Sequence, residues 1–572
     1  MPHPEHTDRA ALDAAIATLR AHKDAWAHLP VAAKITYLET MHQRTGAVAA
    51  RWVAAAAHAK GLPPDSPLVG EEWLSGPWGL LHNLDRLIAS LRAVARRRTP
   101  RLRRGSLHTR PDGQVIAEVF PQTAADRLLF SGITAEVWME PGVTEATLPG
   151  TMAAWYRQAA PAGKVALVLG AGNIAAIAPL DLLHKLIAEG QVCLLKLNPV
   201  NDYLGPILAE IFAPLIADGY VYLAYGGATV GAYLCAHDGI DEIHITGSAR
   251  THDAIVYGPG PAGAERKRRD EPLITRRVTS ELGNASPTIV VPGPWTTADL
   301  CHQAEHLATQ KFHNAGFNCI ASQVLVTPAD WPQERPLLDA LRAMSRALPA
   351  RPDYYPGSTD RLAALVARYP QAESLGPGRA FIPNLDPSRA DEACFTAEIF
   401  GGVLAQTSLP GRDPAAYLDR AVRFCNDALH GTLGVNILIH PATRRELGPA
   451  FEDAIAALRY GCIAINAWTG VGFLLATATW GAHPGHTRAD IGSGTGLVHN
   501  ALLFSRAQKS VIRAPFRPFP RALAGGEATV LPKPPWFVTH RRAAEVAARL
   551  VAFERDHSPR HLPGLLAAAL RG

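Results

Sequence analysis

The stretch Val165-Ala-Leu-Val-Leu-Gly-Ala-Gly-Asn173 is a short apolar run that ends in glycines and then opens a helical segment. A run of this length, bounded by glycine and followed by a helix, is typical of a buried parallel strand. Strands and helical segments keep alternating after it, which predicts an α/β fold with a parallel sheet covered by helices. The expected strands are 164–169, 191–196, 220–224 and 241–245, and the expected helices are 174–189, 203–217 and 228–237.

The turn after this first strand also resembles a dinucleotide-binding turn. Gly170-Ala-Gly-Asn-Ile-Ala175 fits the GxGxxA pattern after a strand and at the opening of a helix. That pattern expects an acidic residue at the end of the second strand, whereas Lys196, Leu197 and Asn198 stand there. The glycine pattern alone is therefore a weak indication of dinucleotide binding.

A second stretch, from Lys311 to Thr327, places Cys319 between a turn that contains Gly316 and an apolar β-type run. A thiol at the mouth of a strand can be partly exposed, as a nucleophile requires. The alternative is a small buried core residue, which is the commoner role of a free cysteine.

Four side chains with complementary chemistry follow one another along the chain. Asn173 offers an amide donor, Lys196 a cation, Glu281 a carboxylate and Cys319 a thiol. In that order they supply an oxyanion hole, a nucleotide contact, a general base and a nucleophile. The alternative role for Glu281 is a helix cap or a salt bridge.

With these motifs the chain resembles the aldehyde dehydrogenase superfamily. The resemblance runs from about 161 to 402, more weakly to about 516, and so covers roughly 60 per cent of the chain. Six motifs carry it: Asn173, Lys196, His244-Ile-Thr-Gly-Ser248, Glu281-Leu-Gly, Asn314-Ala-Gly-Phe-Asn-Cys319 and Glu398-Ile-Phe-Gly401.

The resemblance implies an aldehyde dehydrogenase-like fold of two α/β domains with parallel-type sheets, one for the cofactor and one for catalysis, plus a β oligomerisation arm. It also implies a homodimer or homotetramer. The expected domains are a cofactor-binding domain at 1–283 with N-terminal helices and an inserted β arm at about 107–145, a catalytic domain at 284–490, an oligomerisation strand at 491–516 and a C-terminal tail at 517–572.

The resemblance assigns a catalytic set and a cofactor set. Cys319 attacks an aldehyde, Asn173 and the Cys319 backbone N–H hold the oxyanion, and Glu281 activates the water that hydrolyses the thioester. The cofactor is NAD or NADP, with NADP at least as probable, because Pro199 stands where NAD-preferring relatives often carry a ribose-binding Glu. His252 stands where a glycine of the pyrophosphate turn is expected. The cofactor-binding residues are Lys196, Asn198, Gly247, Ser248, Leu282, Gly283, Glu398 and Phe400.

Three other functions stay open. A fatty-acyl-CoA reductase or CoA-acylating aldehyde dehydrogenase would use the same fold and Cys319, although the presence of Glu281 favours hydrolysis. A Cys–His hydrolase would pair Cys319 with His313 and work without a nicotinamide. A catalytically silent structural homologue would keep the fold and bind no cofactor.

Composition sets further bounds. The net charge of +5 comes from scattered arginines, and runs such as 96–104 read as solvated loops, so no nucleic-acid partner is expected. Seven cysteines without a CxxC pair argue against a disulfide framework and a zinc site, and we expect no metal. The N-terminus has no signal pattern and the most apolar window, 470–480, is too short to span a bilayer. We therefore expect a cytoplasmic protein without an integral membrane segment.

The flanking regions are less informative. Residues 8–60 have helical periodicity with Asp8 as a candidate N-cap, 71–97 form a second helical segment, and 107–139 have a β-type pattern. The segment 352–387 reads as loop with one helix near 359–368. Trp468, Phe473 and Trp480 wall an apolar pocket or belong to the core. The tail contains a helix at about 541–556, and neither the tail nor the segment 96–104 has a functional interpretation.

Overall fold

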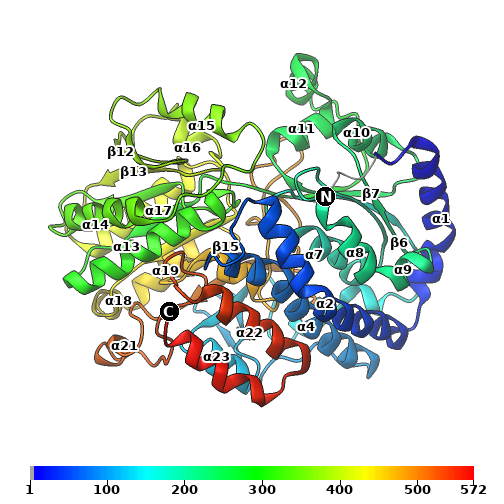
Figure 1. Ribbon diagram of the computed structural model, residues 1–572, viewed down its shortest axis with the longest axis horizontal. Helices are drawn as coiled ribbons and strands as arrows, with labels where there is room; N and C mark the ends of the chain where they lie inside the picture. The colour runs from blue at the N-terminus through cyan, green and yellow to red at the C-terminus, as the bar shows by residue number, and fades with distance from the viewer. Residues whose placement is uncertain (1–5) are drawn as a thin grey trace.

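The computed structural model describes residues 6–572 and contains two β-sheets, one of six strands and one of eleven. Figure 1 shows the two halves side by side, with α13 (Thr297–Phe312), α14 (Glu334–Ala347) and α17 (Pro414–Asp427) on the left and α8 (Gly205–Ile211), α9 (Ala213–Ala217) and α10 (Ala228–Ala236) on the right. The α/β class predicted from the alternating pattern is confirmed.

The six-stranded sheet is built from the alternating segment. Its strands are parallel except for β16, which pairs antiparallel with β8 at one edge. The order is β16 (Gly494–Thr495), β8 (Val278–Leu282), β7 (Glu242–Gly247), β4 (Val165–Leu169), β5 (Val192–Lys196) and β6 (Val221–Ala224). The helix expected at 174–189 begins later, at Ile177, and its second half from His184 to Ala188 is a π-helical turn.

The eleven-stranded sheet has a parallel centre and antiparallel edges. Seven neighbouring strands, from β17 to β12, run parallel. The order is β1 (Leu107–Thr109), β2 (Val115–Phe120), β3 (Thr134–Met139), β17 (Ala507–Arg513), β15 (Cys462–Ile465), β14 (Gly434–Leu438), β9 (Pro287–Val290), β10 (Val324–Pro328), β13 (Val403–Leu409), β12 (Arg379–Leu385) and β11 (Glu373–Gly376).

The β arm pairs within the chain. β3 lies antiparallel to β17, with Val137 opposite Ser510, and β17 lies parallel to β15. The arm therefore extends the chain's own eleven-stranded sheet. The homodimer or homotetramer expected from the resemblance stays a prediction.

The N-terminal region forms helices that pack on the six-stranded sheet. Asp8 caps α1 (Arg9–His28), accepting a 2.7 Å hydrogen bond from the Ala11 N–H, as predicted. The periodic segment is two helices rather than one, because Pro30 follows α1 and starts α2 (Val31–Ala59). The second segment is divided into α3 (Val69–Trp73), a π turn (Leu74–Trp78) that contains Pro77, and α4 (Gly79–Ala95).

The largest difference from the sequence-based expectation lies in 352–387. It contains α15 (Ser358–Val366) as predicted, and also the edge strand β11 and its neighbour β12. The tail contains the predicted helix, α22 (Ala543–Asp556), and a further one, α23 (Leu562–Ala569). Leu550 and Leu565 of these helices pack in the same core cluster as Trp78.

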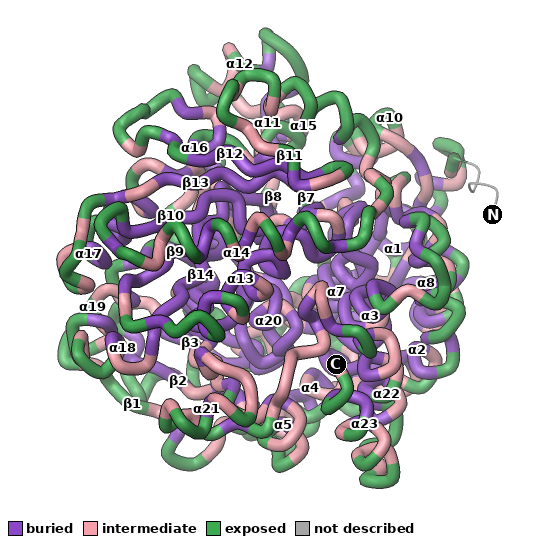
Figure 2. Tube along the Cα trace, turned by 60° about the vertical axis from the view of Figure 1, so that its left-hand side comes forward, coloured by how far each residue is buried: buried purple, intermediate pink, exposed green. Residues whose placement is uncertain are grey.

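Burial follows the layers of the fold. Figure 2 shows the strands of both sheets as buried, while the covering helices such as α14 and α17 carry the exposed faces. None of the helices within residues 6–572 combines the length and hydropathy that crossing a lipid bilayer requires.

Candidate active site

Two cavities meet at Cys319. The larger, of about 1490 Å³, lies at the carboxyl ends of β4, β5 and β7, where open α/β sheets bind their ligands. The smaller, of about 40 Å³, lies on the other side of the thiol. Cys319, Asn173 and Ile177 line both cavities. Cys319 is partly exposed, as the sequence predicted.

The turn before Cys319 has a strained backbone. Asn314 and Ala315 adopt φ values of 53° and 56°, which residues with a side chain rarely adopt. Gly316 follows at φ 81°, and a Cβ atom there would lie 2.6 Å from the Gly401 carbonyl oxygen. Only glycine fits this approach between the turn and the Glu398 segment.

A buried polar network from the N-terminal helices holds this turn. Lys60 Nζ donates to Asn314 Oδ1 (3.0 Å) and to the Asn173 carbonyl oxygen (3.1 Å), and it pairs with Glu72 (2.8 Å). The Asn314 N–H donates to Glu71 (2.9 Å), whose carboxylate forms a two-pronged pair with Arg351. The strained turn is thus fixed from outside the predicted motifs.

Sequence reasoning missed this network. The network could have been suspected from Glu71 and Glu72, two adjacent acidic residues in an otherwise apolar helical segment. Carboxylates are buried only when they are paired, so these two residues would need buried partners of opposite charge.

Asn173 is held against the nucleophile turn. Its side-chain Nδ2 donates one hydrogen bond of 3.0 Å to the Phe317 carbonyl oxygen. An amide nitrogen carries two N–H groups, so the second is available to an oxygen atom beside Cys319. This is the placement an oxyanion donor needs.

Two carboxylates lie beside the thiol. Burial raises the pKa of Glu281 to about 7, and the negative charge of Asp181 adds to the rise, while the Cys319 thiol and Trp480 indole offset part of it. Burial raises the pKa of Glu398 to about 8, with a further rise from Glu281. Burial also raises the pKa of the Cys319 thiol well above its usual range, and both carboxylates reinforce this. The thiol is therefore protonated at neutral pH and needs a base.

The structure brings most of the predicted cofactor residues to the larger cavity, and Leu282 is the exception. Leu282 is buried and points away from the cavity, whereas its neighbour Gly283 lines it. His252 is buried on the far side of α11 (Ala249–Tyr257) and does not narrow the cavity. The residues that line it are Lys196, Asn198, Gly247, Ser248, Gly283, Glu398 and Phe400.

The chemistry of this lining fits a dinucleotide. Ser248 caps α11, so the first N–H groups of that helix face the cavity and can bind a phosphate. Lys196 adds a cation. At the other end, a Cβ on Gly283 would lie 1.9 Å from Glu398 Oε1, so the carboxylate rests directly on the glycine backbone.

The smaller cavity is apolar. Trp468, Phe473 and Trp480 all line it. The rings of Phe473 and Trp480 meet edge to face, with 5.5 Å between their centroids. His313 stands beside Trp468, and burial lowers its pKa to about 4, so it is neutral at physiological pH. Trp536 from the C-terminal tail closes one wall. The contribution of Trp536 to this cavity could not be predicted from the sequence, because the residue lies in a Pro-rich linker without periodicity.

Comparison with known proteins finds aldehyde dehydrogenases among the proteins that this chain resembles. Residues 123–353 match the family model described as "Aldehyde dehydrogenase family". A coniferyl aldehyde dehydrogenase from Pseudomonas sp. is 27% identical over 288 residues, which are 47% of this chain and 56% of that protein. The chain spans between 32% and 56% of the length of the first curated relatives it matches.

Solved structures share the fold over most of the chain. An aldehyde dehydrogenase from Mycobacterium tuberculosis, complexed with NAD⁺, superposes with a TM-score of 0.60 at 17% identity, over 89% of this chain and 91% of that one. An NADP-dependent glyceraldehyde-3-phosphate dehydrogenase from Bacillus halodurans, complexed with NADP, gives 0.59 at 17% identity, over 88% and 91%. The family match over residues 123–353, the curated relatives and the shared fold all indicate the aldehyde dehydrogenase superfamily.

Proposed function

We propose that this protein oxidises an aldehyde to a carboxylic acid with NAD or NADP as the hydride acceptor. One observation carries the proposal: Cys319 and Asn173 line both the large cavity and the small apolar one. A dinucleotide in the first and an aldehyde in the second would meet at the sulfur, with Glu281 on the same cavity wall.

The first half-reaction joins the aldehyde to the enzyme. Glu281 takes the proton of the Cys319 thiol, and the sulfur attacks the carbonyl carbon to form a thiohemiacetal. The free N–H of Asn173 stabilises the developing oxyanion. The nicotinamide, when bound, accepts the hydride that leaves this carbon, and a thioester on Cys319 remains.

The second half-reaction hydrolyses the thioester. Glu281, once deprotonated again, removes a proton from water as its oxygen attacks the thioester carbon. The C–S bond then breaks, and the acid leaves. Because the carboxylate of Glu281 must be ionised, we expect turnover to fall as the pH drops below about 7, the pKa of this group.

The cavity linings support two finer proposals. Lys196 ends β5, and Asn198 and Pro199 lie in the turn that follows. No carboxylate from this turn repels a 2′-phosphate, so we infer that NADP is accepted at least as well as NAD. The aromatic wall around the small cavity favours an uncharged, apolar aldehyde, because an unpaired charge would lose its hydration there.

The test is an initial-rate assay of the purified protein with a panel of apolar and charged aldehydes, each with NAD and with NADP. We expect reduced nicotinamide to form with apolar aldehydes, and no formation with Cys319→Ala. Nicotinamide-independent hydrolysis, or an equal rate in Cys319→Ala, would contradict the proposal. Added coenzyme A that diverts the acyl group into a thioester product would favour the CoA-linked alternative.

A further inference from the structure

A seam of polar side chains runs through the six-stranded sheet behind Glu281. In a strand, every second side chain points to the same face. On β7 that face carries Glu242, His244 and Thr246. The register places Thr279 of β8 opposite His244, and Glu281 opposite Thr246. Thr246 is therefore the neighbour of the active-site carboxylate on that face.

The helix above this face supplies the matching groups. Asp181 on α7 (Ile177–Leu183) accepts a 2.7 Å hydrogen bond from the Thr246 hydroxyl. His244 Nε2 lies 3.5 Å from Asp181 Oδ2, and its Nδ1 is 2.9 Å from the Thr279 hydroxyl. His499 reaches the other oxygen, with Nε2 3.6 Å from Asp181 Oδ1. Asp181 thus has a hydroxyl and two imidazoles around one carboxylate.

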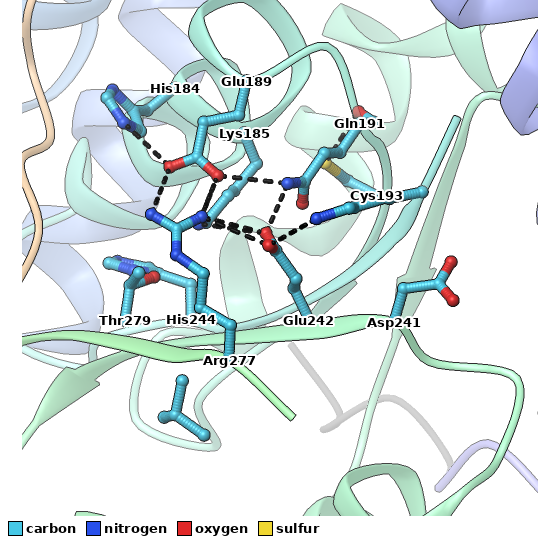
Figure 3. A network of polar contacts seen from close by, with 12 residues as sticks. His184, Lys185, Glu189, Gln191, Cys193, Asp241, Glu242, His244, Arg277 and Thr279 are labelled. Carbon is cyan, nitrogen blue, oxygen red and sulfur yellow. Dashed lines mark hydrogen bonds and ion pairs between the residues drawn. The ribbon is translucent and has the colours of Figure 1, made fainter. Parts of the chain in front are cut away.

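The same face of β7 also carries Glu242, which belongs to an outer group of ion pairs that Figure 3 shows. His184 pairs with Glu189 (3.5 Å), and Arg277 bridges Glu189 (2.7 Å) and Glu242 (3.1 Å). Lys185, buried beneath them, also pairs with Glu189 (2.9 Å). This outer end lines a separate cavity of about 660 Å³, remote from the one that holds Cys319.

The two ends of the seam differ in how their buried charges are paired. The outer end is a set of ion pairs between the sheet and the helix, which accounts for its burial. The inner end has two buried carboxylates, Asp181 and Glu281, on one face, and its protein groups of opposite charge are histidines that carry charge only when protonated. Asp181 is 0% exposed and Glu281 2%. When both are ionised and the imidazoles are neutral, the cluster carries two negative charges, so its burial favours the uptake of protons.

The charged groups that face each carboxylate can be named. Glu281 faces Cys319, Glu398 and Asp181. Asp181 faces His244 and His499. Burial alone would raise the pKa of Asp181, but His244 and His499 lower it below its ordinary value, so Asp181 stays ionised.

We propose that Asp181, His244 and His499 form a proton acceptor that resets Glu281 between the two half-reactions. This rests on the proposed function. Glu281 takes the thiol proton first and cannot deprotonate water until it has lost it. No hydrogen bond joins Glu281 to Thr246 in this structure, so the protonated side chain must turn toward Thr246, its neighbour across β7 and β8, to pass the proton on. An imidazole beside Asp181 then accepts the proton. No electron is transferred in this step.

The test uses Asp181→Asn and His499→Gln, with Ser280→Ala as control, because Ser280 lies on the opposite face of the same strand as Glu281. We expect the first turnover of nicotinamide reduction to remain near the wild-type rate in both variants, while steady-state turnover falls by about tenfold or more. Intact-protein mass spectrometry should then find the acyl adduct on Cys319. Ser280→Ala should match the wild type.

The pH profile separates a proton acceptor from a merely structural role. Removing the negative charge of Asp181 lowers the pKa of Glu281, so the acid limb of turnover should move to lower pH in Asp181→Asn. If Asp181→Asn fails to fold, His499→Gln decides through adduct accumulation alone. Wild-type steady-state rates without adduct in folded variants would overturn the inference. Absence of nicotinamide reduction by the wild type would instead overturn the proposed function.

Discussion

The two cavities that meet at Cys319 are built in different ways. Much of the larger is formed by the turns that follow β4, β5 and β7 of one sheet, and its lining contains both polar and apolar groups. The smaller is formed by segments that are distant in sequence, including the π turn at Leu74–Trp78 and Trp536 of the tail, and its lining is apolar. Local motifs therefore describe the first, whereas only the folded chain describes the second.

The largest expected effect lies at the junction of the two cavities. Glu281→Gln removes the base but keeps the shape of the side chain, so steady-state turnover should fall by about 100-fold or more. Stopped-flow measurement of nicotinamide reduction at high and low pH would check this. A variant that retains the acid limb near pH 7 would show that another group is the base.

The next effect tests the larger cavity. In Gly283→Ala the new Cβ would overlap Glu398 Oε1, so the carboxylate must move away from its seat. We expect kcat/KM for the cofactor to fall by about tenfold, because the position of bound groups controls the rate. Gly150→Ala is the control, since a Cβ there meets no atom within 4 Å. An unchanged KM for the cofactor would remove Glu398 from the cofactor site.

A smaller effect is expected in the apolar cavity. Trp536→Ala removes one wall, so compact aldehydes should lose about tenfold in kcat/KM as the fit loosens, and bulkier ones should gain. Trp536→Phe keeps an aromatic wall and should stay closer to the wild type. The KM for the cofactor should not change, and a change in it would mean that the cavities are not independent.

The smallest effect concerns cofactor choice. Pro199→Glu places a carboxylate after β5, at an exposed position. We expect the ratio of kcat/KM for NADP over NAD to fall severalfold, because like charges repel. Thermal unfolding should be unaffected. An unchanged ratio would indicate that the 2′ position is bound elsewhere.

The same contrast explains what the sequence could predict. The alternation from Val165 to Gly247 was readable because short strands rich in apolar residues, such as β4, are followed by turns and helical segments. The proposed catalytic residues Asn173, Glu281 and Cys319 were readable because their neighbours form motifs. Which of these motif residues act in catalysis stays a prediction.

The missed features depend on long-range contacts. Strands β11 and β12 carry no clear alternation, since β12 is buried on both faces except at Asn384. Lys60 and Asn314 are 254 residues apart, and their hydrogen bond has no local pattern. The Asp181 cluster was hidden for the same reason, because its partners come from three separate elements.

The indole of Trp536 has a consequence for how such a protein diversifies. It lies more than two hundred positions downstream of the nucleophile, in a segment that carries none of the catalytic motifs. We expect substitutions there to alter which molecules are admitted while the proposed reaction machinery stays intact. Selectivity and chemistry can thus change independently within a single polypeptide, and libraries aimed at new substrates should begin in this segment.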